Sequence, residues 1–434
     1  MLRILYGTAG TGKSAAIMDE IRRGADSGER YILLVPEQYS HEAERELCAV
    51  CGDGLSLYAE VLSFTGLARE ISSECGGAAN EYLDKGGRLL CMALAADGLY
   101  SRLRVYGAAR RKAELQTMLL GAVDEFKSAC VTSERLLDAA ETCEGALGDK
   151  LHDLGLILEA YDGVVANGRA DPSDRLSVLA QQIGQCSMSE RTHVFVDGFT
   201  DFTAQERRVL EALLSKGVCL TVCLGCDELH GGSEVFALSR ITASALLKFA
   251  ADNGVKAQTE RFGGESTKAK PLGEFCENMF SYRAVEAGDA EDRIKIISAA
   301  DMNAECEFAA AEAVSLVRDT GCRWRDIAVC AKGFDDYRLP LESAFSRFGA
   351  PIYTARKADM LSKPLPMLIE SAYEIILGGW EADDVFDYLR TGFGGLDTDE
   401  CDDYRQGADP QKGLPEPAPA PSRSWRQRRF RQSA

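Results

Sequence analysis

The sequence predicts an α/β protein built on a parallel β-sheet. Short apolar runs recur at 2–6, 31–35 and 57–64, and each has the length of one buried strand. A helical pattern from 14 to about 25 separates the first two runs. Strand, helix and strand at this spacing favour a parallel sheet with crossover helices on its faces.

A helical insertion is predicted to interrupt this sheet between about 81 and 185. Apolar side chains repeat there at helical spacing, at Leu115, Leu119, Ala122, Val123 and Phe126, and again at Leu151, Leu154, Leu158, Tyr161 and Val165. Strand patterns return in HVFVDGF (193–199) and GVCLTVCLG (217–225), with a helix at about 205–214 between them. We therefore expect 1–80 and 186–262 to form one domain around the insertion at 81–185.

A second α/β unit is predicted over about 290–400. Strand patterns at 293–299 and 326–332 alternate with helical patterns at 303–318 and 337–348, and the unit is too short to be complete. The segment 405–434 differs from everything before it. Proline alternates with small residues there, and the last part, 421–434, contains five arginines and no acidic residue. A disordered tail, a basic contact for nucleic acid and a shifted reading frame that truncates the protein all fit this composition.

Composition and charge restrict the class of protein. The chain has 46% hydrophobic and 27% charged residues, as soluble globular proteins do. No apolar run reaches the roughly 18 residues that span a membrane, and the first residues lack a signal peptide, so we expect a cytoplasmic protein without a membrane contact. The net charge of −19 opposes attraction to nucleic acid over the whole surface. Any DNA contact must then come from a local basic lining or from a partner.

The fifteen cysteines do not indicate disulfide bonds in a chain of this size. Two close groups are candidates for zinc, namely Cys48 with Cys51 and Cys219 with Cys223 and Cys226. A structural zinc site needs four ligands in a compact turn. The first group lies in a helical pattern and the second in a strand-like run, so we interpret both as free thiols.

The segment GTAGTGKS matches G-x-x-x-x-G-K-[ST] between a predicted strand and a predicted helix. Its glycines let backbone N–H groups point at a phosphate, and the helix N-terminus adds its dipole. The lysine of this motif reaches the β- and γ-phosphates and the serine coordinates Mg²⁺. The sequence therefore predicts an ATP and Mg²⁺ site formed by Gly7, Thr8, Ala9, Gly10, Thr11, Gly12, Lys13 and Ser14.

A second motif follows the strand VFV, where Asp197 occupies the position of a residue that holds Mg²⁺. P-loop ATPases usually follow this aspartate with a glutamate that activates water, but here the next residue is Gly198. A glycine cannot accept a proton, and loss of one such group typically slows chemistry by roughly 10² to 10⁴. Glu206 lies nine residues after Asp197, across a predicted turn and helix start, and we do not expect it to substitute. Nucleotide binding without effective hydrolysis is the predicted result.

The run DGFTDFT (197–203) resembles the D-E-F-Q-D-T-N motif of superfamily 1 helicases. Asp197, Phe199 and Asp201 are retained, while Gly198 replaces the glutamate and Thr200 the glutamine. An intact phosphate loop beside DGFTDFT is similar to the helicase-like half of the B subunit of the AddAB helicase–nuclease. The likeness extends over about 2–400 through four further stretches, ILLVPEQYSHEAE, VLSFTGLARE, DIAVCAKGFDDY and APIYTARKADMLSKPLPMLIESA.

This resemblance implies a fold and a biological role. The fold is that of a P-loop NTPase of the superfamily 1 helicase type, with a partial second RecA-like domain. The role is in DNA double-strand-break repair and recombination, as a heterodimer with an A subunit that supplies the motor. The family also carries a nuclease domain and an iron–sulfur cluster, and we expect both to be absent from these residues. Glu125, Phe126 and Lys127 have the E-x-K form of such nucleases, but they lie in a helical pattern, and we assign them to a solvated helix face.

Two other functions remain open from the residues. An active DNA-dependent ATPase would need a catalytic carboxylate at 198 and a complete second α/β unit. A small-molecule kinase with a phosphate loop would need an arginine-rich lid, and the long helical insertion argues against it.

Overall fold

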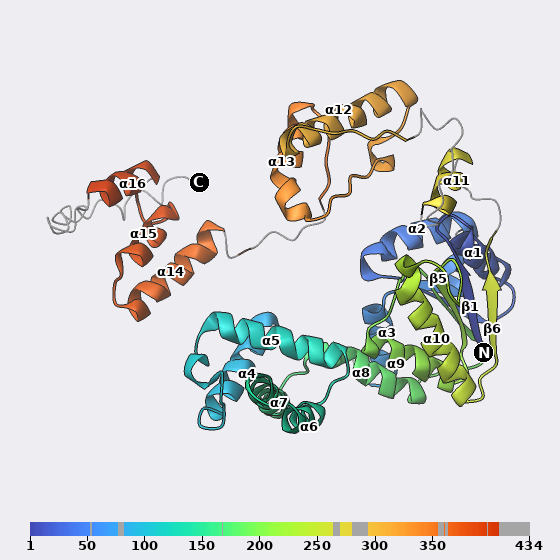
Figure 1. Cartoon of the computed structure of the whole chain (residues 1–434), viewed down its shortest axis with the longest axis horizontal. Helices are drawn as coiled ribbons and strands as arrows, with labels where there is room; N and C mark the ends of the chain where they lie inside the picture. The colour runs from blue at the N-terminus through green and yellow to red at the C-terminus, as the bar shows by residue number, and fades with distance from the viewer. Residues whose placement is uncertain are drawn as a thin grey trace, which may run out of the picture. The chain divides into compact units, whose positions relative to one another are not determined.

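The computed structural model describes residues 1–407 except 53, 77–81, 167, 264–269, 280–293, 355–359, 361–362 and 397 (Figure 1). The chain divides into two compact units, 1–296 and 297–434. The part of the predicted tail from 408 onward lies outside the described residues. The domain boundaries predicted above stay predictions.

The first unit contains a six-stranded parallel sheet in the order β3-β2-β4-β5-β1-β6. The predicted parallel α/β fold is thereby confirmed at the level of the sheet, and the five apolar runs all become strands. The sixth strand was not predicted, because its sequence AQTER lacks an apolar run and its side chains are exposed at the sheet edge. The strands are β1 Leu2–Gly7, β2 Arg30–Leu34, β3 Ala59–Leu62, β4 Thr192–Val196, β5 Cys219–Gly225 and β6 Ala257–Arg261.

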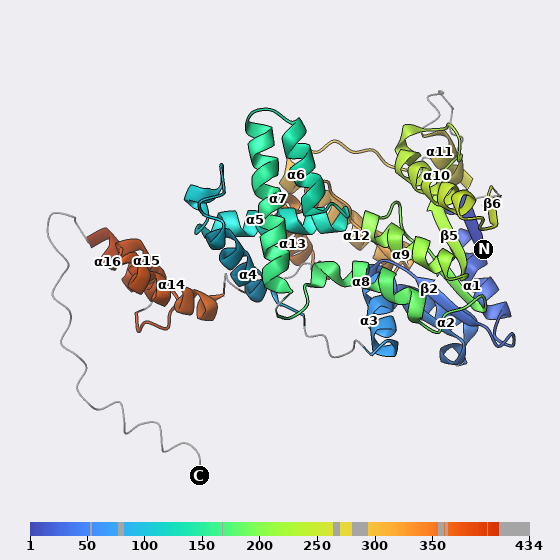
Figure 2. The same ribbon diagram turned by 90° about the horizontal axis from the view of Figure 1, so that it is seen from below.

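Helices cover both faces of the sheet (Figure 2). Side chains alternate along each strand, so that Ile4 and Leu5 enter different cores. On one face, α1 Lys13–Arg23 and α2 Ser40–Cys51 pack on the strands through residues such as Ile17 and Leu47. The other face is covered by α3 Phe64–Glu74, α8 Arg175–Gln182, α9 Ala204–Ser215 and α10 Ala237–Asp252. A further helix, α11 Lys270–Asn278, follows β6.

The helical insertion has a core of its own. The predicted apolar faces are confirmed, since Leu119, Val123, Leu158 and Tyr161 are buried together between its helices. Leu179 on α8 instead packs in the core on the face of the sheet that α3, α9 and α10 also cover. The four helices that enclose the separate core are α4 Lys85–Gly98, α5 Ala113–Ser128, α6 Ser133–Thr142 and α7 Ala146–Val165.

The second unit contains helices only, among its described residues. The two predicted helices are confirmed as α12 Met302–Thr320 and α13 Phe334–Arg347, which share a small core. The two predicted strands are wrong, because 294–299 and 327–332 form no strand and Ile296 is 97% exposed. A strand needs a hydrogen-bonded neighbour, which an apolar run alone does not provide. Three more helices follow, α14 Pro364–Gly378, α15 Ala382–Arg390 and α16 Thr398–Gly407.

Candidate functional site

A cavity of about 540 Å³ lies at the carboxyl ends of β1, β4 and β5, which are neighbours in the sheet. This position follows from the topology, because the carboxyl ends of parallel strands meet at one edge of a sheet. The loop after β1 and the segment after β4, almost two hundred residues apart in the chain, both line it. The lining consists of Ala9, Gly10, Thr11, Gly12, Lys13, Ser14, Ala15, Asp197, Gly198, Phe199, Thr200, Cys223, Gly225, Phe236 and Ser239.

Most of the predicted nucleotide-site residues lie in this lining. Gly7 and Thr8 are the exceptions, since they contribute backbone carbonyls behind the loop. Two glycines are required by the backbone, because Gly10 and Gly12 adopt φ of 83° and 88°. Gly7 is required by close approach, since a Cβ there would lie 2.3 Å from the Phe262 carbonyl oxygen. The loop shape is therefore specified by glycine at three separate positions.

The Lys13 ammonium lies against the loop that contains it. Its Nζ donates hydrogen bonds to the carbonyl oxygens of Gly7 at 2.7 Å and Thr8 at 2.9 Å. Burial lowers the pKa of Lys13, and the nearby Cys223 and Asp197 oppose this shift only in part. A half-buried cation at the start of α1 is therefore held at the cavity by neutral carbonyls rather than by a carboxylate partner, which leaves it suited to an anionic ligand.

Asp197 follows β4 directly and continues its ladder, with its N–H donating to the Leu34 carbonyl at 3.0 Å. Its Oδ1 accepts a hydrogen bond from the Gly198 N–H, also at 3.0 Å. Gly198 has φ of +82°, and a Cβ there would lie 3.2 Å from Pro36 Cδ. The chain thus takes a left-handed turn after Asp197 that fits glycine and disfavours any other residue. The backbone conformation at 198 therefore disfavours a glutamate at this position.

The sequence reasoning missed the residues that close the cavity from β5 and α10. Phe236 and Ser239 lie at the start of α10, and the Ser239 hydroxyl donates to the Thr200 carbonyl oxygen at 3.1 Å. This bond ties α10 to the segment after Asp197. No motif marks these two residues; only their position after a predicted strand of the same sheet could have indicated them.

The two phenylalanines of DGFTDFT contact the hydrophobic core. Phe199 and Phe202 pack on each other and on Phe64, with ring centroids 5.2 to 6.2 Å apart. Such aromatic contacts fix the segment between Asp197 and α9. The rigid path of this segment places Asp197 and Thr200 at the cavity.

The Glu206 side chain caps the start of α9. Its carboxylate accepts the Thr203 N–H at 2.8 Å, and the Thr203 hydroxyl accepts the Glu206 N–H at 3.2 Å. This reciprocal pair is a capping box at the start of α9. Glu206 is not among the residues that line the cavity.

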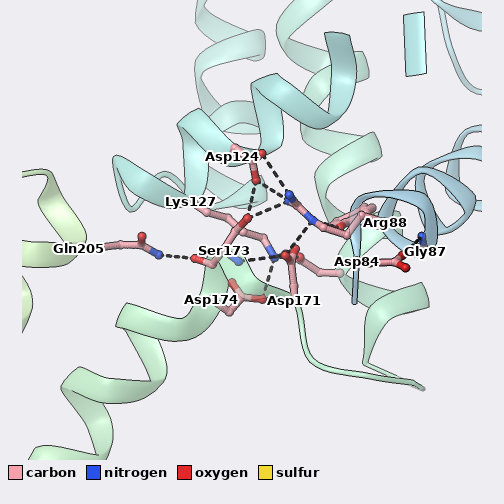
Figure 3. Close-up of polar contacts among 11 residues, drawn as sticks. Asp84, Gly87, Arg88, Asp124, Lys127, Asp171, Ser173, Asp174 and Gln205 are labelled. Atoms are coloured by element: carbon pink, nitrogen blue, oxygen red, sulfur yellow. Dashed lines mark hydrogen bonds and ion pairs between the residues drawn. The ribbon is translucent and has the colours of Figure 1, made fainter. Parts of the chain in front are cut away.

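The interpretation of Lys127 as part of a solvated helix face is wrong. The Lys127 side chain is 7% exposed and its Nζ contacts carboxylates of Asp162 at 2.9 Å, Asp171 at 3.1 Å and Asp174 at 2.8 Å. Arg88 reaches the other oxygen of Asp171 at 3.0 Å. Figure 3 shows the two cations converging on this carboxylate from α5 and α4. The helical periodicity could not reveal these partners, because they lie on α7 and in the turn before α8.

This polar cluster also extends to α9. The Gln205 amide donates to the Ser173 carbonyl oxygen at 2.8 Å (Figure 3). It also donates to the Ser177 hydroxyl at 3.0 Å. Gln205 is buried and lies in the first turn of α9. The predicted insertion and α9 are therefore joined by two partly buried hydrogen bonds.

Comparison with known proteins places the chain in a family. Residues 4–273 match the family model described as ADDB, N-terminal. The chain belongs to this AddB family. The match includes the loop after β1, the helical insertion and the segment after β4.

Relatives of this AddB-family chain are named as the B subunit of an ATP-dependent helicase/deoxyribonuclease. The protein from Acetivibrio thermocellus is 30% identical over 417 residues, which are 92% of this chain and 36% of the relative. The protein from Desulforudis audaxviator is 34% identical over 406 residues, 90% of this chain and 35% of the relative. The chain thus spans little more than a third of the length of these relatives.

Two further observations concern the described residues alone. None of their helices combines the length and the apolarity of a membrane span. No three histidine, cysteine, aspartate or glutamate side chains among them gather as a metal site. Cys48 and Cys51 lie on α2, and Cys219 and Cys223 lie on β5, as the sequence patterns indicated.

Proposed function

We propose that this chain binds Mg·ATP in the cavity between the loop 7–14 and Asp197. The observation that carries the proposal is that the loop, the Lys13 ammonium and the Asp197 carboxylate line one cavity of about 540 Å³. Backbone N–H groups of the loop and the start of α1 would hold the phosphates, with Lys13 on the β- and γ-phosphates. Ser14 and Asp197 would serve Mg²⁺, which commonly takes few protein ligands and keeps several waters.

In this proposal the nucleotide is a structural ligand and the chain is no motor. Gly198 offers no side chain to activate water, and Glu206 is engaged as a helix cap. Bound Mg·ATP would then stabilise the fold by mass action, by about 2.7 kcal/mol at a hundredfold excess over Kd. The fold is accordingly that of a P-loop NTPase of the superfamily 1 helicase type in which binding has been kept and hydrolysis lost.

The biological setting we propose is a DNA double-strand-break repair and recombination complex. The support is the AddB family match and the name of the relatives, the B subunit of an ATP-dependent helicase/deoxyribonuclease. The chain would be the helicase-like part of such a protein, paired with an A subunit that supplies ATP-driven movement on DNA. It would work in the cytoplasm.

Replacing Lys13 by alanine tests the nucleotide site. We expect affinity for a fluorescent ATP analogue with Mg²⁺ to fall at least about tenfold, because a charge-assisted hydrogen bond is worth roughly 1.5–3 kcal/mol. The exposed Lys248 on α10 gives a matched control, and Lys248→Ala should bind as the wild type does. Equal affinity of Lys13→Ala and wild type would refute the proposed site.

A further inference from the structure

One loop of this acidic chain is strongly basic. The segment that joins α4 to α5 reads RLRVYGAARRK at 102–112 and contains five cations and no acidic residue. We call these residues the basic loop. Four of the cations are exposed, and Arg111 is 75% exposed. Figures 1 and 2 both place the loop at the end of the helical insertion away from the sheet. Such a concentration contrasts with a net charge of −19 for the whole chain.

Neighbouring carboxylates do not neutralise the basic loop. Asp97 is shared by Arg110 and Arg111, at 3.0 and 3.1 Å, and Asp149 pairs with Arg104 at 2.8 Å. Among the described residues, Arg102 and Lys112 form no ion pair with a carboxylate. A surplus of positive charge therefore remains even when the buried Asp153 is counted. Exposed pairs of this kind are weak and give way readily to a stronger anion.

The backbone of the basic loop is held in one shape by a buried carboxylate. Asp153 on α7 has no exposed surface, and its oxygens accept the N–H groups of Arg104 at 2.9 Å, Val105 at 2.7 Å and Tyr106 at 3.1 Å. Burial alone would raise the pKa of Asp153, but these hydrogen bonds hold it below its ordinary value. The ionised carboxylate thus fixes three successive residues, which an ordinary surface connection does not require.

An aromatic side chain completes this surface. Tyr100 is 57% exposed, and the Arg110 guanidinium carbon lies 3.8 Å from its ring centroid. Arg110 is thereby held by the ring, by Asp97 and by the Gly107 carbonyl oxygen, to which it donates at 3.1 Å. The loop presents positioned cations beside an exposed ring, an arrangement that suits the phosphates and bases of a nucleic acid.

We propose that the basic loop is a contact surface for the phosphate backbone of DNA. The choice of DNA as the polyanion rests on the proposed function. The contacts that give the loop its shape and its positive surface do not depend on that function. Because the chain as a whole has a net charge of −19, the contact is local, sequence-independent and steeply dependent on salt. It would give the helical insertion a direct role in holding the DNA of the complex.

The test measures binding of the full chain to a fluorescein-labelled DNA duplex by anisotropy, between about 50 and 200 mM NaCl. A loop variant and a control variant lose the same positive charge at exposed positions. The loop variant combines Arg102→Ala, Arg111→Ala and Lys112→Ala. The control variant combines Arg208→Ala, Lys248→Ala and Lys256→Ala.

The loop variant should lose at least about tenfold in affinity at the low-salt end, and its slope of log K against log salt should fall by about 2 to 3, near 0.9 for each lost phosphate contact. The control variant should keep most of the affinity and the slope. Equal losses in both variants, or no binding by the wild type, would overturn the proposal. Titration with the fluorescent ATP analogue on the same samples tests the nucleotide site separately, because that cavity contains no residue of the basic loop.

Asp153→Asn tests the role of loop shape. Removal of a negative charge near the loop would by itself strengthen DNA binding. Loss of the ionised acceptor frees the N–H groups that it holds, and we expect this effect to dominate, so that affinity falls at least severalfold while far-UV circular dichroism stays unchanged. A gain in affinity with an intact spectrum would contradict the preorganised loop. If the variant unfolds, the loop variant above still decides the proposal.

Discussion

Replacing Lys127 by methionine is expected to destabilise the helical insertion by about 3–5 kcal/mol, the usual cost of breaking a buried ion pair from one side. Methionine keeps the length and much of the volume of the lysine stem, so the loss reports the ammonium. Asp171 has no exposed side-chain surface and, among the described residues, would keep only Arg88 as a cationic partner. Asp162 and Asp174 would lose the same ammonium.

Mutual contacts outweigh burial for Lys127 and Asp171. For Asp174 burial prevails and raises its pKa above the ordinary value, although the hydrogen bond from Lys127 opposes this shift. Burial opposes the charged form of Lys127, yet hydrogen bonds to Asp174 and Asp162 raise its pKa above the ordinary value. Burial likewise raises the pKa of Asp171, but the Ser173 N–H, Lys127 and Arg88 lower it below the ordinary value. A carboxylate whose folded pKa is lowered stabilises the fold above its unfolded pKa of about 3.9, and this stabilisation is lost as pH falls through the folded value.

Urea unfolding followed by far-UV circular dichroism measures the loss, and hydrogen exchange of α5 and α7 assigns it to the insertion. The matched control is Lys150→Met on α7, because that lysine is exposed and forms no ion pair among the described residues. We expect the control to stay within about 0.5 kcal/mol of wild type. A change below about 1 kcal/mol in Lys127→Met would mean that water reaches the cluster and screens its charges.

The strands that could be predicted from the sequence are those whose burial produces a continuous apolar run. Strands such as β2 and β4 are buried on both faces, so each appears as a continuous apolar run. The edge strand β6 is exposed and has no such run. The segments 294–299 and 327–332 are the opposite case. Their apolar composition predicts strands, but they have no neighbouring strand to pair with. Periodicity reports burial, and only tertiary structure decides whether a backbone finds its hydrogen-bonded partner.

The candidate site was predictable to a similar degree. The loop 7–14 and Asp197 could be found because the chemistry of phosphate and Mg²⁺ binding restricts both residue type and spacing. Phe236 and Ser239 lack such a restriction, and the shape of the turn at Gly198 depends on Pro36 from a different strand connection. The Lys127 cluster was missed for the same reason, since Asp171 lies 44 residues away in sequence.

The second large effect concerns ATP hydrolysis, which we expect to remain far below about 1 s⁻¹, the lower end of the range of working enzymes. Without a carboxylate to activate water, the rate should be lower by roughly 10² to 10⁴ than in a motor with a complete site. The measurement is steady-state hydrolysis with and without single-stranded DNA, on protein freed of contaminating ATPases. A DNA-stimulated rate above about 1 s⁻¹ would contradict the binding-only proposal and favour an active motor.

Restoring the carboxylate by Gly198→Glu is not expected to restore hydrolysis. Gly198 has φ of +82°, and its added Cβ would meet Pro36 Cδ at 3.2 Å, so any side chain costs roughly 1–2 kcal/mol in this turn or forces it to another shape. Gly198→Ala is the matched control, because it introduces the same backbone strain without a carboxylate. Both variants should be similarly destabilised, and both should stay as inactive as wild type. If Gly198→Glu alone hydrolysed ATP at a motor's rate, the turn would be compatible with catalysis after all, and the missing carboxylate would be its sole defect.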